Sequence, residues 1–182
     1  MAEKITLKNN TQSVDLEIKD ASVGPSVIDL KSFYNDTGYF TFDPSYSTTA
    51  SCESKITYID GAKGILEYRG YPIEQLAEQS TYLEVAYLLF NGELPSSNIA
   101  LDEFRSEVKQ NMTLPENMDV IFSGFGKEAH PMAMLTTAVA ALSGSYHEGI
   151  DIRDKEHQKE FFFNILGKMP ILVANVFNHN QK

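Results

Sequence analysis

A stretch without charged residues, from Pro131 to Tyr146, constrains the fold of this chain more than any other feature. Its positions hold apolar residues together with many small ones, chiefly alanine, threonine, serine and glycine. A helix that is apolar on all sides has to be covered on all sides, because an uncovered face would leave apolar surface in water. The stretch therefore predicts a helix over 131–146 that is buried all round.

A second apolar segment covers 155–179 and predicts another buried helix. Pro170 lies inside it and should kink it, since the proline ring removes one backbone hydrogen bond and crowds the carbonyl four residues back. A chain of 182 residues can hardly surround both helices by itself. We therefore expect the protein to form a dimer with a second copy of itself through 131–146 and 155–179.

Other segments of the second part of the chain also carry helical signals. A short helix is expected to start at Pro72, which suits a first helical position, and to end near Gln79. Thr81 and Glu84 have the spacing of a capping box for the next helix, which Gly92 should end. Apolar residues at steps of three and four predict an amphipathic helix over 97–112.

The start of the chain predicts strands instead. Apolar and polar residues alternate on either side of Asn9-Asn10, which is typical of a half-buried hairpin. A second hairpin is expected from the strand patterns of 55–59 and 64–68. The segment between the hairpins, from Asp20 to Thr48, contains several turn-forming glycine, proline and aspartate residues and should be extended and loop-like.

The expected architecture is therefore mainly α, with a small β-hairpin-rich region over residues 1–70 and a helical part over 71–182. A chain of this length can bury about 70% of its unfolded surface, which suits one domain or a large part of one. We expect a single, incomplete domain.

Charge and cysteine content exclude several classes of protein. The chain has 15 Lys and Arg against 25 Asp and Glu, a net charge of −10, so it lacks the basic surface that nucleic acid binding needs. Its single cysteine, Cys52, excludes an internal disulfide, is expected to be buried and inert, and points to the cytoplasm. No uncharged apolar run reaches the ~20 residues that cross a bilayer, and the start has no secretory signal, so we expect no membrane contact.

The residue types that could carry chemistry are scattered. The only arginines, which would grip a di- or tricarboxylate, are Arg69, Arg105 and Arg153, too far apart in sequence to suggest one anion site. We interpret His130 as a cap at a helix start and His147 as a partner of a helix C-terminus. No two histidines have metal-ligand spacing. We therefore predict no catalytic, cofactor-binding or metal-binding residue in this chain.

A long, ordered and nearly ungapped resemblance to a known family covers most of the chain. It is strongest over 40–95 and clear again at His130-Pro131-Met132 and Gly167-Lys168-Met169-Pro170. The strongest part includes Phe40-Thr41-Phe42-Asp43-Pro44, Thr49-Ala50-Ser51-Cys52-Glu53-Ser54, Glu67-Tyr68-Arg69-Gly70-Tyr71-Pro72 and Asn91-Gly92-Glu93-Leu94-Pro95. These segments resemble the N-terminal part of citrate synthase, closest to the bacterial, hexameric type.

The resemblance implies both a fold and an activity. Citrate synthases are mainly helical, with a large domain and a smaller mobile one, and they join acetyl-CoA to oxaloacetate to give citrate and CoA at the entry of the tricarboxylic acid cycle. Acetyl-CoA is then a co-substrate, and no further cofactor is implied. The family keeps its catalytic histidines and aspartate beyond the region that this chain matches. The resemblance therefore implies an N-terminal part of the large domain, inactive by itself, whose helices 131–146 and 155–179 pair subunits into dimers and in some members into hexamers.

Some bacterial members bind NADH as an inhibitor on this part of the subunit. Three residues resemble that allosteric pocket: Met112, Tyr146 and Lys168. Three others depart from it, because they stand where the family usually has arginine or histidine: Lys109, Gln110 and Asn164. These departures predict that NADH regulation is weak or absent.

Two alternatives remain open at this point. The first is a 2-methylcitrate synthase, which uses a propionyl donor and would differ mainly outside this chain. The second is a non-enzymatic dimerisation module with the same fold. The acidic hairpin region at the start favours the bacterial citrate type.

Overall fold

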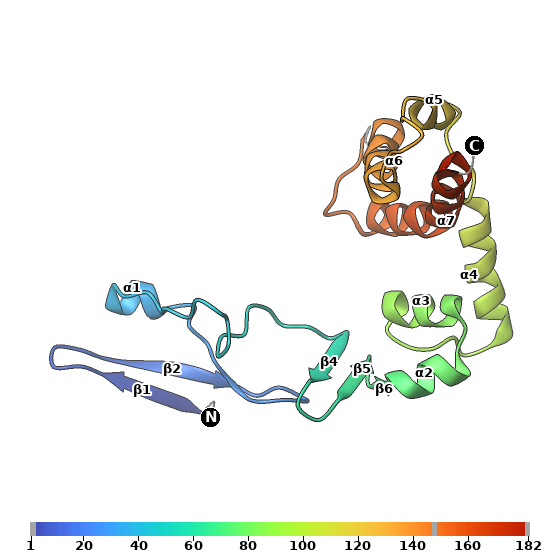
Figure 1. Ribbon diagram of the computed structural model, residues 1–182. Helices are drawn as coiled ribbons and strands as arrows, with labels where there is room; N and C mark the ends of the chain where they lie inside the picture. The colour runs from blue at the N-terminus through green and yellow to red at the C-terminus, as the bar shows by residue number, and fades with distance from the viewer. Residues whose placement is uncertain (1–2, 147–148, 181–182) are drawn as a thin grey trace. The chain divides into compact units, whose positions relative to one another are not determined.

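The computed structural model describes residues 3–146 and 149–180 (Figure 1). Its internal contacts divide the chain into two compact units, Met1–Leu94 and Pro95–Lys182. Among the described residues, the first unit holds all the strands and three short helices, and the second unit is built from four helices. The mainly α architecture with small β-hairpins near the start agrees with the sequence prediction.

The first unit contains two small antiparallel sheets. In one, β1 (Lys4–Lys8) pairs with β2 (Ser13–Lys19), and β2 pairs with the two-residue β3 (Val27–Ile28). In the other, β4 (Thr57–Asp60) pairs with β5 (Ile65–Tyr68), and β5 pairs with β6 (Tyr71–Pro72). The alternation of apolar and polar residues correctly predicted which side chains of the first hairpin face inward, since Leu16 is buried while its two neighbours are exposed. Both predicted hairpins are confirmed.

Two expectations for the first unit are wrong. The segment between the hairpins is not wholly extended, because α1 (Phe33–Thr37) lies within it and ends at Gly38 in the left-handed conformation. The rings of Tyr34 and Phe40 stack across this turn with their centroids 4.4 Å apart, a contact that the sequence pattern did not predict. Cys52 is exposed rather than buried, because it lies in a stretch that pairs with no strand.

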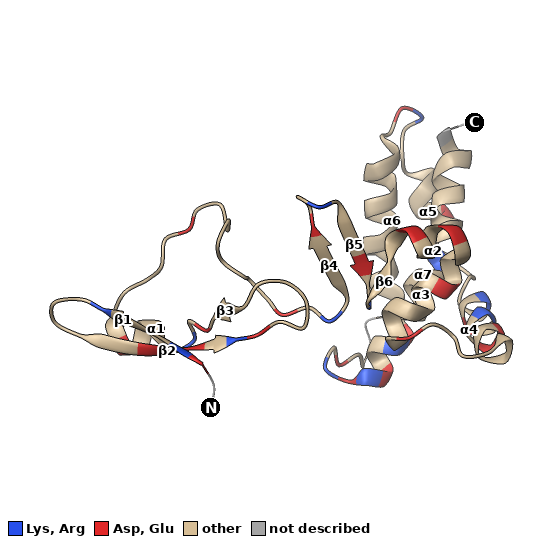
Figure 2. Ribbon diagram, turned by 90° about the horizontal axis from the view of Figure 1, so that it is seen from below, with Lys and Arg blue, Asp and Glu red and all other residues tan. Residues whose placement is uncertain are grey.

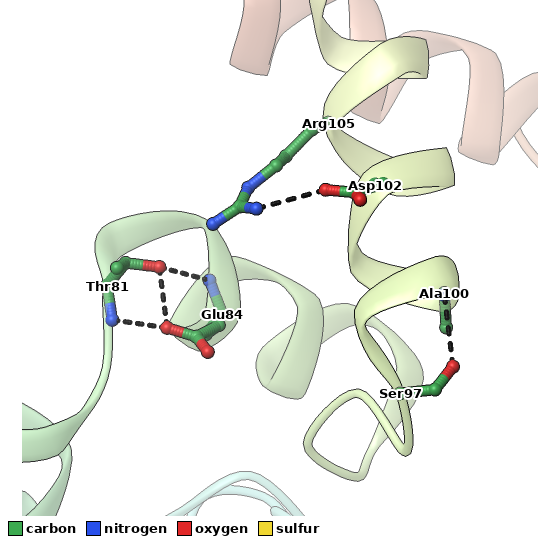
Figure 3. Close-up of polar contacts among 6 residues, drawn as sticks. All are labelled: Thr81, Glu84, Ser97, Ala100, Asp102 and Arg105. Carbon is green, nitrogen blue, oxygen red and sulfur yellow. Dashed lines mark hydrogen bonds and ion pairs between the residues drawn. The ribbon is translucent and has the colours of Figure 1, made fainter.

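Two helices complete the first unit. The first, α2, covers Ile73–Gln79, and α3 covers Tyr82–Asn91. The predicted capping box is present at the start of α3 (Figure 3): the backbone N–H of Thr81 donates to Glu84 Oε2 at 2.6 Å, and the backbone N–H of Glu84 donates to Thr81 Oγ1 at 3.4 Å. Gly92 ends the helix with a φ of 94°, a conformation that glycine adopts without strain.

The second unit consists of α4 (Asn98–Gln110), α5 (Met118–Ser123), α6 (Pro131–Tyr146) and α7 (Lys155–Asn180). Ser97 caps α4 by accepting a hydrogen bond from the backbone N–H of Ala100 (Figure 3). The core lies where α5, α6 and α7 meet, and its buried members are Met118, Phe122, Met134, Ala138, Leu142, Leu172 and Val176. Within α7 the direction of the helix changes along its length (Figure 1), as expected for a helix that contains Pro170.

Helices α6 and α7 are each buried on one side only. The ribbon of α6 is free of charge throughout (Figure 2), yet Met132 is 58% exposed. On α7, Phe161 is 56% exposed and Phe177 is 63% exposed. A single chain therefore does not surround both helices, as expected, because its other helices cover only one face of each. Burial of the remaining faces by a second copy stays a prediction.

Helix α7 is also long and apolar enough to cross a bilayer, by length and composition, and no other helix in the described part of the chain is. The core helix of a folded domain passes the same test. The packing of α7 favours a core helix over a membrane-spanning one, because Leu172 and Val176 lie in the core shared with α5 and α6.

Candidate functional site

A buried lysine is the most unusual feature of the second unit. Lys168 lies in the middle of α7 and is only 3% exposed. Its Nζ donates to the backbone carbonyl oxygen of Asn111 at 2.9 Å and to Asn164 Oδ1 at 2.6 Å. The same Nζ lies 5.0 Å from the centre of the Tyr146 ring. Three residues from three segments thus converge on one ammonium group.

The close approach of two helices explains why this lysine is buried. A Cβ placed on Gly167 would lie 2.7 Å from the carbonyl oxygen of Val108, so only glycine allows α7 to pack this tightly on the end of α4. That contact brings the next residue, Lys168, onto the carbonyl of Asn111, the residue that caps the C-terminus of α4. A cation at this place offsets the partial negative charge of the helix end.

No carboxylate in the described part of the chain forms an ion pair with Lys168. Its partners are the neutral oxygen atoms of two asparagines and one aromatic face. Taking a cation out of water is costly unless it is paired, so an unpaired buried ammonium is a group that favours an anion beside it.

Two hollows in the second unit share Lys168, Asn164 and Tyr146. The first has a volume of about 480 Å³ and polar walls that include Gln110 and Glu160. The second, of about 470 Å³, lies between α6 and α7 and has mostly apolar walls. Both fall in the size range of small-molecule sites.

The structure thus brings together two of the three residues that resemble the family's allosteric pocket. Tyr146 and Lys168 are in contact and line both hollows. Met112 follows Asn111 directly but lines neither of these two hollows. Of the three positions that depart from the family, Gln110 and Asn164 line the first hollow, and Lys109 does not.

Two of the three arginines, Arg69 and Arg105, are engaged in local contacts. Arg69 donates from Nη2 to the carbonyl oxygen of Leu89 at 3.0 Å, near the end of α3, and from Nη1 to that of Lys55 at 3.3 Å. Arg105 forms an exposed ion pair with Asp102 on its own helix at 3.1 Å (Figure 3). Neither arginine is available as part of a preformed carboxylate site.

The histidines have local roles as well. His130 accepts a hydrogen bond at Nδ1 from the backbone N–H of Met132 at 3.2 Å, so it caps the start of α6 as predicted. His157 accepts from the backbone N–H of Asp151 at 3.0 Å. His147 lies outside the described residues. Across residues 3–146 and 149–180 no group of three or more His, Cys, Asp or Glu side chains could hold a metal ion.

One polar cluster was not anticipated from the sequence. Asp43 accepts hydrogen bonds from the backbone N–H groups of Thr48 and Ser47 and from the hydroxyl groups of Ser47, Thr48 and Thr49. The Thr48 N–H bond, followed by the Thr49 hydroxyl, holds the pKa of Asp43 well below its usual range. The signal for it was an aspartate followed by three hydroxyl residues, which we read only as part of a loop.

The comparisons with known proteins agree on one family. A family model described as the C-terminal domain of citrate synthase matches residues 45–182. The solved citrate synthase of Thermotoga maritima MSB8 is similar with a TM-score of 0.64 and 28% identity, covering 78% of this chain and 36% of that one. That of Pyrobaculum aerophilum has a TM-score of 0.60 and 28% identity, covering 98% of this chain and 41% of that one.

A third similar structure carries ligands. The citrate synthase of the thermophilic archaeon Thermoplasma acidophilum, solved as a ternary complex with carboxymethyl coenzyme A and oxaloacetate, has a TM-score of 0.67 and 27% identity. The match covers 74% of this chain and 35% of that one. The chain thus spans between 35% and 41% of the length of these solved relatives. Because the family model covers well over half of the sequence, this chain belongs to the citrate synthase family.

Proposed function

We propose that this chain is part of a citrate synthase, which condenses acetyl-CoA with oxaloacetate to give citrate and CoA. The family match over residues 45–182 carries the proposal. The Thermoplasma acidophilum relative supports the two substrates, since it was solved with a coenzyme A derivative and oxaloacetate. The resemblance to the bacterial, hexameric type belongs to the same proposal.

The reaction needs groups that residues 3–146 and 149–180 do not supply, so we place its catalytic residues outside residues 1–182. Removing the weakly acidic proton next to a thioester takes a base together with donors that stabilise the enolate. Two of the described histidines, His130 and His157, act as local hydrogen-bond acceptors, and Arg69 and Arg105 are engaged with backbone and side-chain oxygens. We expect this part of the chain to be inactive by itself.

A second copy of the chain is the partner that we propose for α6 and α7. Each helix has an exposed side with large apolar groups, represented by Met132 on α6 and by Phe177 on α7. The exposed side of α6 also carries small residues such as Ala140, which let another helix come close. Burying such faces in an obligate interface of roughly 2,000 Å² or more outweighs the entropy that association costs.

NADH should bind the complete protein weakly at most. Asn164 uses its side-chain oxygen for Lys168, and at 8% exposure it has little surface left for a ligand. It stands, like Lys109 and Gln110, where the family's NADH pocket usually has arginine or histidine. Each missing charge-assisted hydrogen bond is worth about 1.5–3 kcal/mol. Two such losses weaken binding by roughly a hundredfold or more.

Product analysis tests the proposed activity and separates it from the methylcitrate alternative. The complete protein is incubated with oxaloacetate and either acetyl-CoA or propionyl-CoA, and the products are identified by mass spectrometry. Citrate formed faster than 2-methylcitrate at equal donor concentrations supports the proposal. Preferential formation of 2-methylcitrate assigns the propionyl donor instead, and no product with either donor favours a non-enzymatic module.

A further inference from the structure

The start of α6 is capped by a residue outside the types that usually cap helices. His130 stands directly before Pro131, the first residue of the helix, and its Nδ1 accepts from the backbone N–H of Met132 at 3.2 Å. The residues preferred at this position are serine, threonine, aspartate and asparagine. None of those four changes its charge between pH 5 and 8, whereas histidine does. The cap of α6 is therefore a contact of the kind that responds to pH.

The hydrogen bond that forms this cap requires a neutral imidazole. A neutral ring has one nitrogen that donates and one that accepts, so Nδ1 of His130 accepts only while the ring proton lies on Nε2. In the charged ring both nitrogens donate, and Nδ1 would then face the N–H of Met132 donor to donor. The added charge would also lie at the positive end of the helix dipole. A single proton thus removes the bond and adds an unfavourable charge.

The other backbone donors in the first turn of α6 do not depend on this side chain. The carbonyl oxygen of His130 accepts from the N–H of Ala133 at 2.9 Å and from that of Met134 at 3.2 Å. Pro131 has no backbone N–H. Among the described residues, the imidazole of His130 is the one acceptor for the N–H of Met132. Loss of the cap therefore leaves this donor without a protein partner.

Other ionisable groups near α6 do not engage the imidazole. Lys127 and Glu128 precede His130 in the loop, and α5 and α7 pack against α6. The charged residue of α5 is Asp119, and α7 carries five charged or titratable residues between positions 155 and 160, followed by Lys168 and His179. In the part of the chain that the structure describes, none of these groups forms a hydrogen bond or an ion pair with His130. The imidazole is exposed, so protons reach it from the solvent.

We propose that His130 makes the start of α6 sensitive to pH, capping the helix while its imidazole is neutral and releasing the first turn when the ring takes up a proton. The bond is made by the neutral form, so its contribution is complete on the alkaline side and is lost as the pH falls through the range in which imidazole groups titrate. The rest of the helix is held by Met134, Ala138 and Leu142 in the core. The response is therefore confined to the first turn of α6.

Amide hydrogen exchange of the complete protein tests this proposal, measured by mass spectrometry at pH 8 and at pH 5 and corrected for the intrinsic pH dependence of exchange. Protection of the first turn of α6 should be about fivefold lower at pH 5, the effect of losing one N-cap. The first turn of α4 is the internal control, because the Ser97 hydroxyl that caps it does not titrate in this range. Equal protection of α6 at both pH values, or a fall of the same size in α4, overturns the proposal.

Two variants assign the response to one imidazole. His130→Asn supplies a good N-cap that stays neutral, so protection of the first turn of α6 should be equal at pH 8 and pH 5. His157→Asn is the matched control, because His157 also accepts from a backbone N–H, that of Asp151, but before α7. This control should keep the fivefold difference in α6. A difference that persists in His130→Asn, or that disappears in His157→Asn, contradicts the assignment. These measurements contain no substrate, so their outcome is independent of the proposed activity.

Discussion

Gly167 is the residue on which the packing of the second unit depends most directly. Its missing side chain lets α7 touch the end of α4, where an added Cβ would lie 2.7 Å from the carbonyl oxygen of Val108 and 2.9 Å from the carbonyl carbon of Asn111. Gly167→Ala should therefore destabilise the protein by about 1–3 kcal/mol, the usual cost of overpacking. Urea denaturation measures this as a lower midpoint.

Gly126→Ala is the control for this prediction. Gly126 lies between α5 and α6, its φ is not positive, and an added Cβ would meet nothing within 4 Å. Because alanine leaves the unfolded chain fewer conformations than glycine, this variant should be more stable by about 0.4–1 kcal/mol. Equal midpoints for the two variants would show that the helices are not in the close contact described.

Asp43 predicts a local dependence on pH. Its pKa is held below the ordinary value of 3.8 by hydrogen bonds from Thr48, Thr49 and Ser47 to the charged carboxylate. These bonds therefore order the loop at every pH above the ordinary value, and they are lost only as the pH falls through the lower pKa of the folded state. A carbon-13 titration of the Asp43 carboxyl by NMR should give a midpoint below 3.8. A midpoint at or above that value contradicts the cluster.

At the scale of single elements, the capping box of α3 gives the sharpest prediction. Thr81→Ala removes the hydroxyl that accepts from the backbone N–H of Glu84 and leaves that donor without its partner (Figure 3). The loss of such a cap costs about 1 kcal/mol. Amide hydrogen exchange in the first turn of α3 should accelerate by about fivefold.

Thr137→Ala is a matched substitution at an exposed position inside a helix. Within the part of the chain that the structure describes, the hydroxyl of Thr137 bonds only to the carbonyl oxygen of Ala133 in its own helix. Since alanine has the higher helix propensity, exchange in α6 should stay the same or slow down. A slowing of exchange in α3 by Thr81→Ala would refute the cap.

Elements with local signals could be predicted from the sequence, and elements that depend on distant contacts could not. Thr81, Glu84 and Gly92 fix both ends of α3 by bonds within the helix, and the structure has them as expected. The short helix α1 has neither a side-chain cap nor a buried residue, so no local pattern marks it, and Cys52 lies in a stretch that forms no strand, so both were missed.

The candidate site shows the same limit. Family resemblance pointed to Tyr146 and Lys168, and the structure places them in contact. Nothing in the sequence indicated that the carbonyl of Asn111, 57 residues away, would accept from Lys168. That contact arises only because Gly167 lets two helices meet, which is a property of the packed unit and not of either segment.

For the whole molecule, the exposed sides of α6 and α7 predict self-association. Ala140→Glu places a charge on the exposed, charge-free side of α6, where it would lie unpaired in the proposed dimer interface. The desolvation of an unpaired charge is costly, so this variant should sediment as a monomer or aggregate, whereas the unchanged protein sediments as a dimer or larger assembly.

Ala77→Glu is the control for the interface, because it makes the same change at an exposed position of α2. It should leave the sedimentation coefficient unchanged. An unmodified protein that remains monomeric at ~100 µM, far above the nanomolar dissociation constant of an obligate pair, would rule out this interface.

The most direct test of the central claim compares two proteins in one assay. Release of free thiol from acetyl-CoA in the presence of oxaloacetate is measured for the complete protein and for residues 1–182 alone. We predict turnover of roughly 1–10³ s⁻¹ for the complete protein, as is common for enzymes, and none above background for residues 1–182. Thiol release by residues 1–182 at a comparable rate, or its absence from the complete protein, would contradict the account.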